Sequence, residues 1–311
     1  MKVLCTGGAG FIGSNLCISL REQGHQVHVV DDLSTGHKHH LRELHDMGCK
    51  VTVCDYGDGA THSLIYGSNF DVVFHVGAIP RVQYSIEHPA ETDNNNVFKT
   101  LKLLEACVNN VGRVVFSSSS AVAGSTRLEY PSPEDIVKAP LSPYAQQKST
   151  VEEYCKIFGS LYGLDTTCLR YFNVYGPKQY GNSPYSTVIS AWCQAIRDGR
   201  PLRIDGDGSQ SRDFCYVDNV VQANILAATS QHKFNGDVFN IAHGECHTVN
   251  DVLELFKTRF NDLNIVYAQP RVGDVHKTHA DITKARSVLK YVPNIMFTEG
   301  LTRTWDWWAS L

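Results

Sequence analysis

The sequence predicts an α/β fold, a doubly wound parallel sheet that carries a smaller C-terminal lobe. Over the first third of the 311-residue chain, short apolar and β-branched segments alternate with amphipathic segments. A glycine-rich turn follows the first apolar segment. After Tyr171 the texture changes, and Gly, Pro, Asn, Ser and Tyr crowd residues 176–186, where the second lobe is expected to begin. Alternating strands and helices are typical of parallel sheets with helices on both faces.

The individual elements follow from the hydrophobic pattern. Helices are expected at about residues 12–24, 37–47, 93–110 and 144–162. Short β-branched runs predict strands at Lys2–Thr6, Gln26–Asp31, Lys50–Cys54, Val72–His75, Arg113–Ser117, Thr166–Arg170 and Val238–Ile241. The last strand lies beyond the change of texture, so the chain is expected to return to the first lobe before it ends.

Charge and hydropathy argue against two classes of partner. The chain has 28 Lys and Arg against 32 Asp and Glu, a formal net charge of −4, so the basic surface that nucleic acid requires is not expected. No apolar run approaches the ~18 residues that span a bilayer. A strand pattern begins at Lys2 and leaves no room for a signal peptide. Neither secretion nor membrane insertion is expected.

Cysteine and histidine are frequent, and we interpret both without a metal. The ten cysteines include no Cys-x-x-Cys pair, and several lie in apolar segments, which favours reduced structural thiols in a cytoplasmic protein. The cluster of His37, His39 and His40 lacks a neighbouring carboxylate or thiol pattern. A solvated loop is expected there, and no metal site.

The turn after the first strand has the composition of a dinucleotide site. Lys2–Thr6 runs into the glycine-rich residues 7–13, and a helical pattern follows. Glycines permit a tight turn and let main-chain amides approach a pyrophosphate at the helix N-terminus. The second strand ends in Asp31 and Asp32, whose carboxylates can accept hydrogen bonds from ribose and repel a 2′-phosphate. This context favours NAD over NADP; the alternative is a purely structural turn with a capping aspartate.

Tyr144 and Lys148 lie four residues apart at the start of a predicted helix, so both side chains can face one site. An ordinary tyrosine has a pKa of ~10, and acting as a base near neutrality requires a shift worth about 4 kcal/mol. One positive charge at ~4 Å and an effective dielectric near 20 supplies about that much. The alternative is an ordinary surface pair.

A serine run completes the predicted catalytic group. The strand that begins at Arg113 ends in Ser117, Ser118, Ser119 and Ser120. The C-terminal ends of parallel strands are where a doubly wound sheet places its chemistry. A hydroxyl there could hydrogen-bond an alcohol or a developing ketone beside the tyrosine; a polar strand end is the alternative interpretation.

Together these motifs resemble the extended short-chain dehydrogenases/reductases, specifically nucleotide-sugar epimerases of the UDP-hexose 4-epimerase type. The resemblance covers essentially the whole chain. It is carried by residues 6–13, 31–36, 73–75, 118–122, 144–148, 170–177, 206–214, 216–218 and 270–274.

The resemblance implies roles for individual residues. Ser119, Tyr144 and Lys148 would be catalytic. NAD would contact Gly7, Gly10, Phe11, Ile12, Gly13, Asp31, Asp32, Ser34, Thr35, Gly36, Asp55, Tyr56, Val76, Gly77, Ala78, Pro80, Asn96, Tyr144, Lys148 and Phe172. The UDP-sugar would contact Ser119, Ser120, Asn173, Tyr185, Ser186, Arg203, Asp205, Arg212, Arg271, Asp274 and Thr278.

The resemblance also implies an organisation. A Rossmann domain of residues 1–172 and about 215–242 would hold NAD, and a lobe of about 173–214 and 243–311 would hold the nucleotide sugar. The family commonly pairs its counterparts of helices 93–110 and 144–162 in a homodimer. Here both helices carry apolar faces, which a core-facing stripe would explain equally well.

The implied reaction is inversion at C4 of a UDP-hexose through a transient 4-keto sugar, with NAD regenerated in each cycle. Thr278 stands where a small residue leaves space for an N-acetyl group, which favours UDP-GlcNAc and UDP-GalNAc, with UDP-Glc and UDP-Gal also accepted. The alternatives are a 4-epimerase or decarboxylase of UDP-uronic acids, a nucleotide-sugar 4,6-dehydratase, and a non-catalytic NAD-binding regulator.

Overall fold

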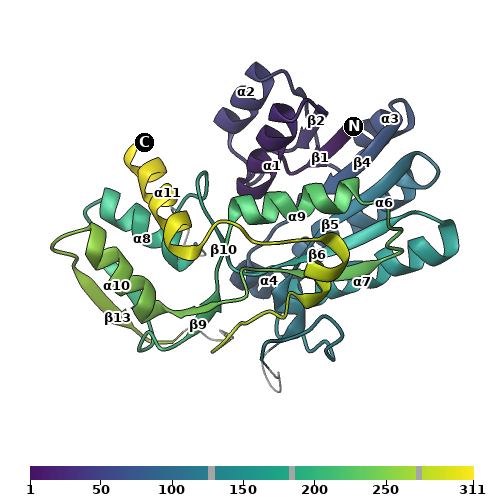
Figure 1. The fold of residues 1–311 in the computed structure, drawn as a ribbon. Coiled ribbons are helices and arrows are strands. Elements are labelled where there is room, and N and C mark those ends of the chain that lie inside the picture. Colours follow the sequence, from purple (N-terminus) through teal and green to yellow (C-terminus); the bar gives the residue numbers. More distant parts are fainter. Residues whose placement is uncertain (125–129, 182–185, 271–274) are drawn as a thin grey trace.

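A parallel sheet of seven strands forms the centre of the computed structural model, which describes residues 1–124, 130–181, 186–270 and 275–311 (Figure 1). The strand order is β11-β6-β5-β4-β1-β2-β3. The strands are β1 Lys2–Thr6, β2 Gln26–Asp31, β3 Lys50–Val53, β4 Phe70–His75, β5 Val111–Ser119, β6 Thr166–Tyr171 and β11 Asp237–Ile241. All neighbours pair in parallel, so every strand ends at the same edge of the sheet. The predicted doubly wound α/β fold is confirmed.

Helices cover both faces of this sheet (Figure 1). One layer holds α1 Phe11–Glu22, α2 Lys38–Asp46 and α9 Val217–Thr229, and the other holds α3 Gly59–Tyr66, α6 Lys99–Cys107 and α7 Pro143–Tyr162. Successive strand residues alternate between the layers: Val3 and Cys5 pack with α1 and α9, whereas Leu4 packs with α6 and α7. This period of two explains why the strands have almost continuous hydrophobic sequences.

A second hydrophobic cluster lies beside the sheet, on the left of Figure 1. It is built from α8 Val188–Arg197, α10 Val249–Arg259 and α11 Phe297–Ala309, around the buried rings of Trp192 and Phe256. Short strand pairs complete it: β7 Val174–Tyr175 with β10 Cys215–Tyr216, β8 Leu202–Asp205 with β13 Ile265–Ala268, and β9 Ser211–Asp213 with β12 Cys246–Thr248. The π-helical turn η3 (Ala285–Leu289) instead packs against the sheet cluster.

The expected helix at 93–110 is present, but it contains a π-helical turn and ends at Cys107. The structure has α4 Val82–Glu87, α5 Pro89–Asp93, a π-helical turn η1 Asn94–Phe98 and then α6. The expected helix at 144–162 is α7, which the Ser142 hydroxyl caps by accepting from Ala145 N at 3.2 Å. It ends at Gly163, whose φ of 70° is left-handed. A short 3₁₀ turn, η2 Ser120–Ala123, follows β5.

The histidine cluster is not a solvated loop, so that expectation was wrong. Residues 38–46 form α2, and the helical period turns His40 inward with Leu41 and Leu44. His40 is fully buried, with Nδ1 2.9 Å from the Ala9 carbonyl oxygen. Burial lowers its pKa to about 4, so the ring is neutral at pH 7.

The prediction of free cysteines is confirmed, since all ten are free and eight of them are buried.

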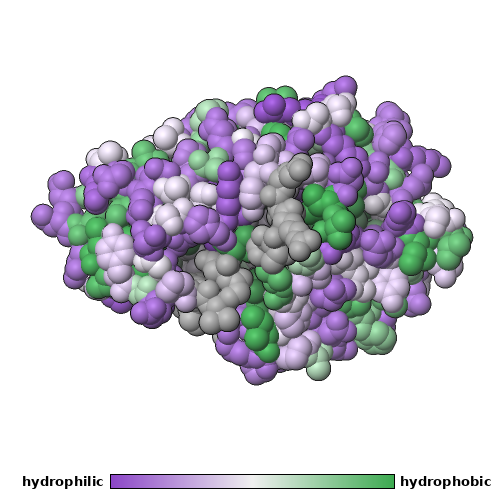
Figure 2. Space-filling model, turned by 90° about the horizontal axis from the view of Figure 1, so that it is seen from below, coloured by the Kyte–Doolittle hydropathy of each residue, from purple (hydrophilic) through white to green (hydrophobic). Residues whose placement is uncertain are grey.

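Across the described parts of the chain, no helix combines the length and apolar character that crossing a membrane would need. Seen from below, hydrophobic residues form separate patches among hydrophilic ones (Figure 2). Large apolar side chains such as Phe74 and Trp192 are instead enclosed, Phe74 against the sheet and Trp192 in the second cluster.

Candidate active site

The turn between β1 and α1 is a cradle that only glycine can form. Gly7 has a φ of +72°, and a Cβ atom there would lie 2.5 Å from the Cα atom of Gly77. A Cβ atom on Gly13 would lie 2.2 Å from the Gly7 carbonyl oxygen. Gly10 is the N-cap of α1, so the first amides of this helix open towards the cradle. This arrangement fits the pyrophosphate of a dinucleotide.

Asp31 is the last residue of β2 and Asp32 follows it, but their environments differ. Asp31 is buried and accepts from Ala9 N and Leu33 N, each at 2.8 Å, so it braces the glycine turn against β2. Asp32 is exposed and accepts from the backbone N and the hydroxyl of Ser34 at 2.9 and 2.6 Å. Both carboxylates lie at the strand end where an adenosine ribose would be held.

The loop after β4 contains the predicted cofactor residues 76–80 and is fixed from beneath. Ile79 N donates to Asn96 Oδ1 at 2.8 Å, and Asn96 Nδ2 donates to Gln147 Oε1 at 2.9 Å. Gly77 N donates to the Thr6 hydroxyl at 3.3 Å. Asn96 is buried, and these hydrogen bonds join the backbone of the loop to α7. Asn96 therefore supports the loop.

His75 anchors the same loop. Its ring nitrogens lie 2.7 Å from the Thr6 hydroxyl and 2.8 Å from the Thr100 hydroxyl. Burial lowers the pKa of His75 to about 3, so a neutral imidazole joins β1, β4 and α6. Sequence reasoning did not assign this role, because only the fold brings the two threonines together.

Asp55 and Tyr56, two residues predicted to contact NAD, are largely enclosed by the protein. Tyr56 is buried, with its ring 4.8 Å from that of His75, and its hydroxyl donates to the Asn95 carbonyl oxygen. Asp55 forms an ion pair with Lys99 and accepts from Gly57 N at 2.7 Å. The predicted cofactor residue Phe172 is also buried.

The three predicted catalytic residues lie together at the sheet edge. Ser119 is the last residue of β5, and Tyr144 lies in the first turn of α7 with its backbone N donating to the Ser85 hydroxyl at 3.0 Å. Lys148 Nζ donates to the Ser117 carbonyl oxygen at 2.7 Å and lies 5.8 Å from the centre of the Tyr144 ring. The spacing of four residues therefore brings phenol and ammonium to one face, as predicted.

Contrary to the expectation from the sequence, the protein alone does not lower the pKa of Tyr144 towards neutrality. Burial raises the pKa of Tyr144 to about 12, and its hydrogen bond with Ser119 lowers it only in part. Burial also lowers the pKa of Lys148 to about 8. Among the protein groups, desolvation therefore outweighs the hydrogen bond of Ser119. A phenolate near neutrality requires a further positive charge beside it, and an oxidised nicotinamide carries one.

Five predicted substrate residues line one cavity of about 370 Å³ between β7, α8 and β8: Asn173, Ser186, Arg203, Asp205 and Arg212. Arg203 Nε donates to Asp205 Oδ1 at 2.7 Å. Thr278 lies next to this group, because its hydroxyl accepts from Asn173 Nδ2 at 2.9 Å. Guanidinium groups suit phosphate because their donors form a planar fork. The predicted contacts Tyr185, Arg271 and Asp274 lie outside the described residues.

Sequence reasoning missed other residues around this cavity. Trp192 and Phe214 line it, and Trp192 Nε1 donates to the Arg203 carbonyl oxygen at 2.9 Å. Behind Arg212, the buried carboxylate of Asp213 accepts from the amides of His243, Gly244 and Ala280 at 3.1–3.2 Å. Burial raises the pKa of Asp213 to about 7. No local spacing distinguishes these residues.

A sequence profile of the NAD dependent epimerase/dehydratase family matches residues 3–242. The chain belongs to this family. It is therefore an NAD-dependent enzyme, and the predicted cofactor is confirmed. The glycine cradle and the group of Ser119, Tyr144 and Lys148 lie at the same edge of the sheet.

Similar proteins extend over the whole chain. A putative UDP-glucose 4-epimerase of Methanocaldococcus jannaschii is 33% identical over 98% of this chain and 97% of its own length. The UDP-N-acetylglucosamine 4-epimerase of Methanobrevibacter ruminantium, solved with UDP-N-acetylmuramic acid, is 38% identical with a TM-score of 0.93, over 99% and 98% of the two chains. The UDP-glucuronic acid 4-epimerase of Bacillus cereus, solved with its substrate and NAD, is 28% identical with a TM-score of 0.91, over 100% and 99%.

Proposed function

We propose that this member of the family is a UDP-sugar 4-epimerase. The observation that carries the proposal is the convergence of Ser119, Tyr144 and Lys148 at the edge of the sheet that also holds the glycine cradle. Support for the second half of such a site, a place for the UDP part of the substrate, comes from the cavity lined by Arg203 and Arg212. Full-length relatives that carry 4-epimerase names support the same reaction.

Each catalytic residue has a distinct task. Tyr144 removes the proton of the sugar C4 hydroxyl and returns it after the sugar has turned. Ser119 forms a hydrogen bond with the Tyr144 phenol. It orients the C4 oxygen of the sugar between its own hydroxyl and that phenol. Lys148 stabilises the phenolate through its positive charge. When bound, NAD would supply a reversible hydride acceptor, so the reaction would need no net oxidant.

The preferred sugar is proposed to be N-acetylated, with UDP-GlcNAc and UDP-GalNAc interconverted and UDP-Glc and UDP-Gal also accepted. Support comes from Thr278, a small side chain bonded to Asn173 beside the cavity. The Methanobrevibacter relative is named for UDP-N-acetylglucosamine. A uronic acid substrate is the second candidate, because the Bacillus cereus relative was solved with UDP-glucuronic acid.

The two parts of the molecule would divide this work. Residues 1–172 and about 215–242 would hold NAD, and about 173–214 and 243–311 would hold the UDP-sugar. The 370 Å³ cavity supports this division, because eighteen of its nineteen lining residues fall between Asn173 and Phe214.

We also propose a homodimer in the cytoplasm. The apolar faces are only partly explained by the core: Leu104, Val151 and Phe158 are buried, but Ile157 and Leu161 on α7 are 42% and 72% exposed, and Phe98 before α6 is 55% exposed. Covering such side chains with a second copy would remove them from water. The ten free cysteines suit a reducing compartment.

The decisive experiment is incubation of the purified chain, without added NAD, with a panel of UDP-sugars and detection of C4 configuration by NMR. Conversion of UDP-GlcNAc to UDP-GalNAc is expected, and it should disappear in Tyr144→Phe while UDP binding persists. Turnover of UDP-glucuronic acid alone would shift the assignment to the second candidate. Bound cofactor with no turnover of any nucleotide sugar would instead indicate a regulator.

A further inference from the structure

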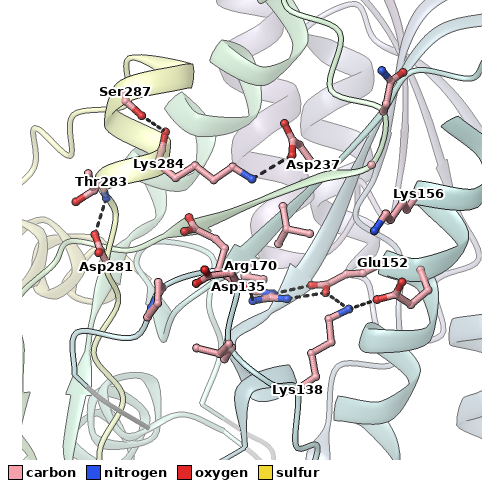
Figure 3. Close-up of a pocket in the computed structure, with 17 residues that line it drawn as sticks. Asp135, Lys138, Glu152, Lys156, Arg170, Asp237, Asp281, Thr283, Lys284 and Ser287 are labelled. Carbon is pink, nitrogen blue, oxygen red and sulfur yellow. Dashed lines mark hydrogen bonds and ion pairs between the residues drawn. The ribbon is translucent and has the colours of Figure 1, made fainter. Parts of the chain in front are cut away.

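Glu152 occupies a buried position on α7 that the chemistry above does not use. Its carboxylate is 1% exposed and fully bonded. One oxygen accepts from Arg170 Nε at 2.8 Å and from the Ser118 hydroxyl at 2.6 Å. The other accepts from Arg170 Nη2 at 2.8 Å and lies 2.9 Å from Lys138 Nζ. Figure 3 shows this carboxylate between the arginine and the lysine, on the wall of a cavity of about 710 Å³.

The cluster joins the two elements that carry the catalytic residues. Ser118 immediately precedes Ser119 on β5, and Glu152 lies one helical turn after Lys148 on α7. Lys148 Nζ also donates to the Ser117 carbonyl oxygen. Two successive residues of the strand are therefore bonded to two successive turns of the helix. This double attachment fixes both the height and the rotation of α7 against β5.

The arginine gives the attachment its rigidity. Arg170 lies on β6, the strand next to β5, and is 2% exposed. It holds the carboxylate with two parallel bonds and donates from Nη1 to the Glu134 carbonyl oxygen at 3.0 Å. A bidentate arginine restricts a carboxylate in direction as well as in position. Glu152 cannot rotate away from Ser118 without leaving a buried guanidinium unpaired.

We propose that Glu152 is a positioning residue, which acts through Ser118 to hold Ser119 against Tyr144. The expected effect on catalysis rests on the proposed function. The expected effect on the position of Ser119 rests on geometry alone. The negative charge has a second effect, since Glu152 raises the pKa of Lys148 against the larger lowering caused by burial. The ammonium form that supports the phenolate is thereby favoured.

Ser118→Ala is the sharpest test, because it removes the link to the strand and leaves the ion cluster intact. We expect kcat to fall about tenfold with KM for the UDP-sugar nearly unchanged, since small misplacements of reacting groups cost large factors in rate. Ser118→Thr keeps a hydroxyl and should restore kcat. Glu152→Gln should lower kcat further.

Thr166→Val is the matched control. The Thr166 hydroxyl also joins a strand to α7, donating to the Cys155 carbonyl oxygen at 2.7 Å, but at a part of the helix remote from Tyr144. The Thr166→Val substitution should reduce thermal stability and leave kcat unchanged. Equal losses of kcat in Ser118→Ala and Thr166→Val, or an unchanged kcat in Ser118→Ala, would overturn the proposal.

Crystal structures of the wild type and of Ser118→Ala test the positioning of Ser119 separately from the proposed reaction. A displacement of Ser119 Oγ from the Tyr144 hydroxyl by about 0.5 Å or more supports positioning, because productive sites tolerate about that much. Superimposable catalytic side chains contradict it. If the wild type turns over no UDP-sugar, the proposed function fails, yet this comparison still decides the role of Glu152.

Discussion

Lys148 reaches Tyr144 from a position that Ser117 fixes. Its Nζ donates to the Ser117 carbonyl oxygen at 2.7 Å and lies 5.8 Å from the centre of the phenol ring. Burial lowers the pKa of this ammonium to about 8, so it is mostly protonated at pH 7 and loses its charge as the pH rises above 8. The charge that favours a phenolate is therefore present at neutral pH and is held in place by the strand.

Replacing Lys148 by Met should lower kcat at pH 7 by about a hundredfold or more, a typical value for the loss of assisted proton transfer. The measurement is turnover of the best UDP-sugar at saturation. Lys290→Met is the control, because Lys290 also donates to a backbone carbonyl oxygen, that of Ser287 at 2.9 Å, but on the surface. Comparable turnover in the two variants would contradict the role of Lys148.

Gly7→Ala should destabilise the fold and abolish cofactor retention. The new Cβ would lie 2.5 Å from Gly77 Cα, so the turn and the loop after β4 cannot both keep their positions. Gly24→Ala isolates the backbone strain, since Gly24 has a similar φ of +81° and a Cβ there would meet nothing within 4 Å. That control should cost about 1 kcal/mol and retain NAD. Thermal melting and assay of the NAD released on denaturation measure both effects, and NAD retained by Gly7→Ala would disprove the cradle.

His75 should make the protein less stable in acid. Its pKa is lowered to about 3 in the folded state from an ordinary value of 6.5, so between these values the unfolded chain binds the proton first. The free energy of unfolding then falls as the pH decreases below 6.5, by about 1.4 kcal/mol per pH unit for this one group. Asp213 opposes it over part of the range, because burial raises its pKa to about 7.

A difference experiment removes the contribution of Asp213. His75→Gln eliminates the titration, and its amide can still bond Thr6 and Thr100, so its free energy of unfolding minus that of the wild type should rise by about 1.4 kcal/mol per pH unit as the pH falls from 6.5 to 4. Denaturant unfolding at several pH values provides the two curves. Parallel curves for wild type and His75→Gln would show that the imidazole does not titrate on unfolding.

The features that follow from local spacing were predictable, and those that depend on the packed fold were not. Tyr144 and Lys148 share a helical face in any α-helix, and Gly7 must be glycine in any such turn. In contrast, the ion pair of Glu152 with Arg170 joins residues 18 positions apart on a helix and a strand. His40 was misjudged because its polar neighbours concealed the inward face of α2.

Thr278 provides the test of sugar preference. Its hydroxyl accepts from Asn173 Nδ2 at 2.9 Å and from Asp213 N at 3.3 Å, so the side chain is fixed beside the cavity. Thr278→Tyr should fill the space proposed for the N-acetyl group and lower kcat/KM for UDP-GlcNAc by about tenfold or more relative to UDP-Glc, a factor that equals 1.4 kcal/mol. Thr278→Val removes the hydroxyl with no added bulk and should leave that ratio unchanged. If both variants change the ratio equally, the lost hydrogen bond and not the space controls the preference; if neither does, Thr278 does not face the sugar.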